Sequence, residues 1–84
     1  MNLYLLRQNQ NIGYDTYDSM VVAAETEEEA RLIHPNQWSD NAWGKTLSFL
    51  KDWADTPDQV TVELLGVAVD GMESGVVISS FNAG

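Results

Sequence analysis

An almost unbroken apolar segment, residues 17–24, is the feature that most constrains how this chain can fold. Its apolar members are Tyr17, Met20, Val21, Val22, Ala23 and Ala24. They occupy both alternating sets of strand positions, and a strand of that kind is buried on much of both faces. We therefore expect a central, well-covered strand with further strands beside it.

The size and composition of the chain set the scale of the fold. With 84 residues it forms one domain, and 21 of them are Leu, Ile, Val or Phe, which is enough apolar content for a charged chain to fold. So short a domain builds one thin core rather than a deep catalytic cleft. We therefore expect no enzyme.

The charge and the missing residue types exclude several classes of site. The formal net charge is −9 and the four cations are scattered, which disfavours direct nucleic-acid binding. The chain has no cysteine and one histidine, His34, so neither a metal nor another cofactor is expected. No apolar run is long enough for a signal peptide or a membrane span, and we expect a cytoplasmic protein without membrane contact.

A capping signal predicts one helix. Thr26 is followed three residues later by Glu29, the pattern of a capping box, and three consecutive glutamates fall in the first turn, where the helix dipole favours carboxylates. Ala30 and Ile33 form an apolar stripe toward the sheet. Pro35 is expected to end the helix.

Three further segments have the composition of strands. They are residues 2–8, 60–69 and 76–81. The first half of 60–69 alternates apolar and polar side chains, which indicates one wetter face. The order of these elements predicts an α+β fold: a small single domain, residues 1–84, with a mostly antiparallel sheet of about four strands and one or two helices on one face.

A tryptophan-rich insert, residues 36–56, separates the two halves of the predicted sheet. Apolar residues at 43, 47, 50 and 53 recur at helical spacing and predict a second helix over 41–53. In that helix Trp43 and Trp53 face inward and Lys45 faces out, which leaves Trp38 as the most exposed ring. Large aromatic rings suit both a core and an interface, so the sequence leaves their use open.

Four short stretches resemble a known kind of protein. GYDTYDS at 13–19, VVAA at 21–24, EEEAR at 27–31 and SFNAG at 80–84 resemble short uncharacterised proteins of bacteria and their phages or prophages. The resemblance implies a context and no catalytic residues. Small phage accessory proteins act by binding a host component, and they include inhibitors of host defence and sponges that sequester signalling molecules.

The candidate binding residues are aromatic or cationic. Trp, Tyr and Arg are over-represented in binding hot spots, and a cation beside a ring can hold a planar anion. The candidates are Arg7, Tyr14, Tyr17, Arg31, Trp38, Trp43, Lys45 and Trp53. Asp15 and Asp18 lack the ligand spacing of a calcium loop, and His34 has no nucleophile motif nearby, so no metal or catalytic residue is predicted.

Three binding functions follow from these residues. The leading hypothesis is a non-catalytic, phage-type accessory or anti-defence inhibitor that binds a host protein through the insert and its acidic rim. The alternative is a sponge for a small anionic, nucleotide-like ligand, with a pocket between the subunits of a homo-oligomer. A lesser alternative is an acidic DNA mimic, in which Asp52, Asp55 and Asp58 form a row if the backbone stays helical to Pro57.

Overall fold

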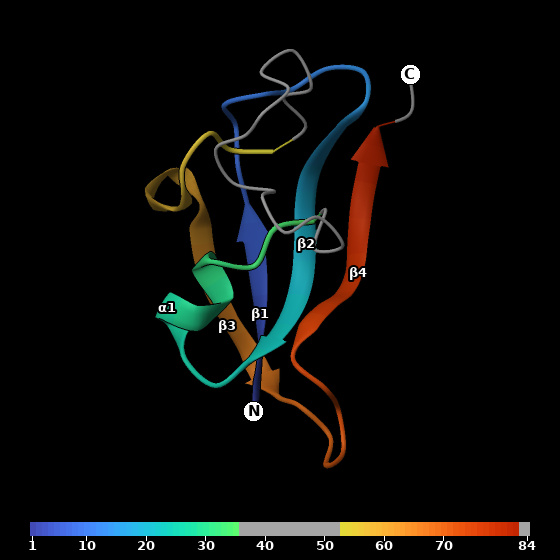
Figure 1. Ribbon diagram of the computed structural model, residues 1–84. Coiled ribbons are helices and arrows are strands. Elements are labelled where there is room, and N and C mark those ends of the chain that lie inside the picture. Colours follow the sequence, from blue (N-terminus) through green and yellow to red (C-terminus); the bar gives the residue numbers. More distant parts are fainter. Residues whose placement is uncertain (36–52, 83–84) are drawn as a thin grey trace.

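The computed structural model describes residues 1–35 and 53–82 (Figure 1). The elements are β1 (Asn2–Arg7), β2 (Thr16–Ala24), α1 (Glu27–Arg31), the 3₁₀ turn η1 (Pro57–Gln59), β3 (Thr61–Val67) and β4 (Gly75–Asn82). The strands form one sheet in the order β3-β1-β2-β4, with every neighbouring pair antiparallel. The predicted antiparallel sheet is confirmed, and β2 lies inside it as its apolar pattern requires.

The core lies on one face of the sheet, beneath α1. Tyr4 and Leu6 of β1 and Met20 and Val22 of β2 share this inner face, because residues two apart in a strand point the same way. Ala30 of α1 packs against them. The cluster also includes Ala24, Trp53, Ala54 and Val60. One short helix therefore covers one side of the sheet.

The start of α1 follows the predicted capping signal in part. The Thr26 hydroxyl accepts a hydrogen bond from the Glu29 N–H at 3.1 Å. The Glu29 carboxylate accepts from the N–H of Glu25 at 3.5 Å, one residue earlier than in a full capping box. The helix dipole favours the three carboxylates of this first turn.

The end of α1 corrects the expected helix length. The helix stops at Arg31, and the N–H groups of Leu32 and Ile33 bond three residues back, to Glu29 and Ala30. Such bonds tighten and close a last turn. Pro35 also disfavours helical backbone at the residue before it, so the helix ends well short of the proline.

The described residues contain one α-helix, fewer than the maximum of two that the sequence predicted. Among the described residues one helix and one 3₁₀ turn are present. The predicted helix over 41–53 lies outside the described residues except for Trp53, which is not helical. The strand predicted over 60–69 is shorter and has no single wet face. Leu64 and Leu65 are 62% and 50% exposed because β3 is an edge strand with a bulge opposite Leu3 and Tyr4.

Replacing the helix cap tests its contribution to the fold. We expect Thr26→Ala to lower the free energy of unfolding by about 1 kcal/mol, because the Glu29 N–H loses its acceptor. Thr26→Ser keeps an oxygen in place and should change it by only a few tenths. Chemical denaturation measures both variants. Equal stability of Thr26→Ala and wild type would show that the cap contributes nothing.

Candidate functional site

The free side of β4 is the most conspicuous exposed feature of the sheet. Within residues 1–35 and 53–82 no strand pairs with that side, and β4 forms the right-hand edge in Figure 1. The strand contains neither a charged residue nor proline, the two common guards of an edge. Val77, Ile78 and Phe81 are 47%, 65% and 47% exposed. We call residues 75–82 with this unpaired side the β4 edge.

Two tyrosines predicted as binding residues lie near the C-terminal end of β4, Tyr17 on the neighbouring strand β2 and Tyr14 in the β1–β2 loop. The ring centroids of Tyr17 and Phe81 are 4.7 Å apart, with the planes tilted by 51°. Tyr14 is 80% exposed. Its neighbour Asp15 donates its N–H to the Asn82 carbonyl, which joins the β1–β2 loop to β4. Tyr17 is partly buried and packs against the core cluster, so of the two tyrosine rings only that of Tyr14 is largely exposed at this end of the sheet.

A buried glutamine holds the loop that carries Tyr14. The Gln8 amide nitrogen donates to the carbonyls of Asn11 and Tyr17, both at 2.8 Å. Its oxygen accepts from the N–H groups of Gln10 and Asn11 at 2.8 and 3.0 Å. These four bonds satisfy the side chain of a residue that is 6% exposed. The loop is therefore fixed from within by one amide.

Further bonds fix the two sides of the same loop. The Thr16 hydroxyl donates to the Gly13 carbonyl at 2.8 Å and accepts from the Gly13 N–H at 3.2 Å. Asp15 takes up a φ of +59°, a conformation that Asp tolerates better than most residues. On the other side, Asn11 donates to the Trp53 carbonyl at 2.6 Å. The position of Tyr14 is consequently built into the fold.

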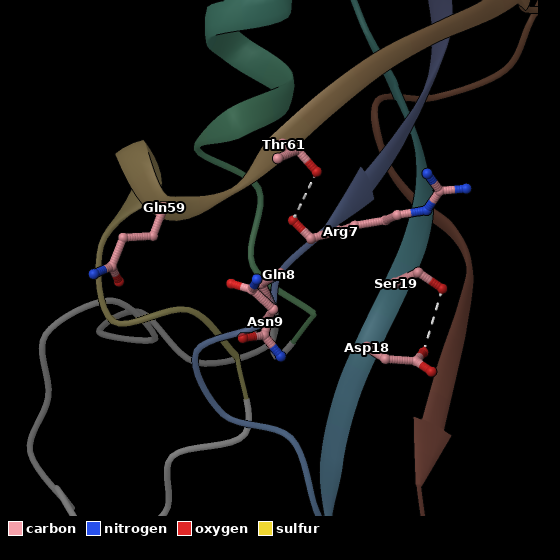
Figure 2. Close-up of a pocket in the computed structure, with 7 residues that line it drawn as sticks. All are labelled: Arg7, Gln8, Asn9, Asp18, Ser19, Gln59 and Thr61. Atoms are coloured by element: carbon pink, nitrogen blue, oxygen red, sulfur yellow. Dashed lines mark hydrogen bonds between the residues drawn. The ribbon is translucent and has the colours of Figure 1, made fainter.

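A polar hollow of about 430 Å³ lies at the same end of the sheet, on the side of β1 (Figure 2). It is lined by Arg7, Gln8, Asn9, Asp18, Ser19, Gln59 and Thr61. The Arg7 guanidinium lies 3.8 Å from the Glu63 carboxylate, and Asp18 adds a second negative charge. With Arg7 balanced in this way, the hollow offers little attraction for the small anion considered from the sequence.

The other candidate residues either contact the protein itself or lie outside the described residues. Arg31 donates to the carbonyls of Val60 and Pro57 and lies 3.4 Å from Glu27, so its guanidinium joins α1 to η1 and to the residue before β3. Trp53 is 1% exposed and belongs to the core, which removes its ring from any surface contact. Its indole N–H has no hydrogen-bond partner in the described part of the chain. Trp38, Trp43 and Lys45 lie outside the described residues.

The geometric condition for the acidic row is not met. Residues 53–56 are not helical and η1 begins only at Pro57, so Asp55 and Asp58 do not continue a helical row. Asp52 lies outside the described residues. The DNA-mimic alternative therefore loses the regular spacing of carboxylates on which it depended.

Sequence reasoning did not single out the β4 edge. The available signal was the absence of any charged residue from Ser74 to the end of a chain with a net charge of −9. That run was correctly predicted as a strand. Its place at the edge depends on the strand order, which periodicity within a segment does not determine.

Comparison of the chain with models of known protein families, with curated proteins and with solved structures found no significant match. In the two described stretches no helix is long and apolar enough to cross a membrane. The same stretches contain no group of three or more His, Asp or Glu side chains placed to hold a metal ion. What the protein binds has to be inferred from the chemistry of its own surface.

Replacing Gln8 tests how the loop at the β4 edge is held. We expect Gln8→Leu to lower the free energy of unfolding by about 2 kcal/mol, because two carbonyls and two N–H groups lose their partners. The amides of Gln10 and Asn11 should also exchange their hydrogens faster. Gln10→Leu, the same change at an exposed neighbour, is the matched control. Equal effects of the two variants would contradict the role assigned to Gln8.

Proposed function

We propose that this protein is a non-catalytic binding protein that takes up an extended segment of a partner protein as an additional strand along the β4 edge. The observation that carries the proposal is an eight-residue edge strand without charge or proline. Strand addition of this kind draws affinity from backbone hydrogen bonds and specificity from alternate side chains. Val77, Ile78 and Phe81 supply apolar contact area for those side chains.

The charge of the protein defines the chemistry of the partner segment. Asp15 and Asp18 are exposed beside the C-terminal end of β4, and the whole chain carries −9. A segment with apolar residues at alternate positions and basic residues at its end fits this surface. The negative field also accelerates encounter with basic partners.

The biological setting is part of the same proposal. The resemblance to short bacterial and phage proteins supports a host protein as the partner, and a cytoplasmic location is consistent with that partner. This assignment moves the recognition surface from the tryptophan-rich insert to β4. The two locations make opposite predictions for matched variants.

A lysine placed on β4 tests the proposed site. Ser79 is exposed and lies in the middle of the strand, so Ser79→Lys adds a charged edge guard without removing apolar packing. We expect it to weaken binding of the captured host partner at least about tenfold, equivalent to about 1.4 kcal/mol. Ser74→Lys, the same change outside the strand, is the matched control and should bind like wild type. Calorimetry with the purified partner measures all three proteins.

A third variant separates the two locations. Trp38→Ala should retain binding if β4 is the site. Loss of binding in Trp38→Ala together with retention in Ser79→Lys would reject the β4 site and favour the insert. Denaturation of each variant shows whether the fold is intact. A small molecule found bound in a native mass spectrum, without protein capture, would favour the sponge instead.

Salt and a single carboxylate test the charge of the partner. We expect the association rate to fall as ionic strength rises, because screening shortens the range of the attraction. Asp18→Asn should reduce the rate at low salt and have little effect at high salt. Stopped-flow or surface-based kinetics provide the rates. A rate that is independent of salt in both proteins would argue against a basic partner segment.

A further inference from the structure

Three cross-strand rows make up the face of the sheet that is turned away from α1, which we call the outer face. Directly paired residues of antiparallel strands project to the same face, so the register identifies each row. The rows are Thr61, Arg7, Ser19 and Ser80; then Glu63, Leu5, Val21 and Ile78; then Gly66, Leu3, Ala23 and Gly75. The first is polar, the second is apolar except for Glu63, and the third is small except for Leu3.

Neither described helix covers this face. Ala30 of α1 packs in the core cluster on the inner face, and Arg31 holds η1 to the same side. Leu5 and Val21, at the centre of the outer face, are only partly buried, and Ile78 beside them is 65% exposed. The apolar row is thus partly accessible, most of all at Ile78, whereas Ala23 in the next row is fully buried.

The outer face is nearly neutral in a strongly acidic protein. Among the acidic residues that the structure describes, Glu63 alone occupies one of the three rows, and it lies 3.8 Å from the Arg7 guanidinium. Asp18 lies in a bulge of β2 and has no directly paired residue on β4. It borders the polar row. The remaining described acids lie in α1, in η1 and its approach, or in the loops. Apart from the Arg7–Glu63 pair and Asp18, the charged side chains that the structure describes therefore lie away from this face.

We infer that the outer face docks against the outer face of a second copy of this chain, with two-fold symmetry. Two copies of charge −9 repel each other wherever their acids meet, and the outer face is where they meet least. A basic partner would instead be drawn to the acidic regions. The neutral apolar face therefore fits a copy of equal charge better than a partner of opposite charge.

The distance between the acidic helices of the two copies keeps their electrostatic repulsion small. Facing sheets pack about 10 Å apart, and each α1, with a diameter of about 10 Å including its side chains, lies about another 10 Å beyond its own sheet. The acidic helices of the two copies are then separated by about 30 Å, several times the Debye length of about 8 Å at physiological ionic strength. The dimer has four layers, helix, sheet, sheet and helix, and both β4 edges stay open.

The area of the face limits the strength of the pair. Four strands spaced about 4.8 Å apart and rows spanning about 20 Å give a contact of about 400 Å² per copy in projection. Standard stable interfaces bury about 800 Å² per partner, so this pair belongs to the weak, concentration-dependent class. A dissociation constant in the micromolar range, well below about 1 mM, is therefore expected.

Sedimentation equilibrium of the whole chain over a wide concentration range tests the inference. We expect the average mass to rise with concentration toward twice the 9.3 kDa of one chain. Leu5→Lys places a charge at the centre of the face, beside Glu63, and should keep the protein monomeric throughout. Leu64→Lys makes the same change at a 62% exposed position on the inner face and should dimerise like wild type.

Three results would overturn the inference. The first is a wild-type chain that stays monomeric up to about 1 mM, a concentration well above the dissociation constant expected for the pair. The second is a Leu5→Lys variant that dimerises normally. The third is a Leu64→Lys variant that fails to dimerise. Ser79→Lys should still dimerise, because it changes the β4 edge and not the outer face. If Ser79→Lys is monomeric and Leu5→Lys is not, the copies pair through β4 and the outer face is not the interface.

A measurement on the wild-type protein keeps the test valid if Leu5→Lys does not fold. Chemical shifts recorded on dilution should change at Leu5, Val21 and Ile78 and stay constant in α1. Changes confined to α1 or to the loops would reject the outer face. The result is independent of any captured partner, so failure of this inference leaves the β4 proposal to its own test.

Discussion

The packing of one short helix on one face of a four-stranded sheet is the contact on which the rest of this structure depends. Ala30 of α1 and Trp53 meet Leu6, Met20 and Val22 in a single thin layer of buried side chains. In the described part of the chain, a domain of this size builds no second layer over the other face or the edges. The exposed outer face and the unpaired side of β4 are direct consequences of that limit.

The distribution of charge decides how those exposed surfaces can be used. Glutamates gather in the first turn of α1, where the helix dipole stabilises them, and other acids lie in loops. The outer face and β4 are left almost without charge. A −9 protein therefore presents neutral apolar surfaces bordered by carboxylates, an arrangement that suits contact at the centre and selection by charge at the rim.

The local elements were predictable because their signals are local. Alternation and apolar content located all four strands to within a few residues, and the Thr26 capping pattern located the start of α1. The strand order was less accessible, since β3 pairs with β1 across the sheet and β4 reaches β2 from the far end of the chain. The identity of the edge strand, and with it the candidate site, depended on that order.

The candidate site residues were also predictable in part only. Tyr14 and Tyr17 were selected because tyrosine is frequent in binding hot spots, and the structure places Tyr14 in the loop tied to the end of β4 and Tyr17 on β2 beside Phe81. The role of Gln8 had no signal in the sequence, because it lies at the start of a polar run typical of any loop. Arg31 and Trp53 were predicted to bind but contact the chain itself, since a cation or a large ring stabilises a small fold equally well.

Hydrogen exchange of the β4 amides, measured with and without the captured partner at a protein concentration too low for dimers, tests whether a partner segment adds a strand to β4. We expect added protection within residues 75–82, where the new strand would pair, and no change in α1. If the β4 amides exchange as fast in the partner complex as in the free protein, strand addition at this edge is contradicted.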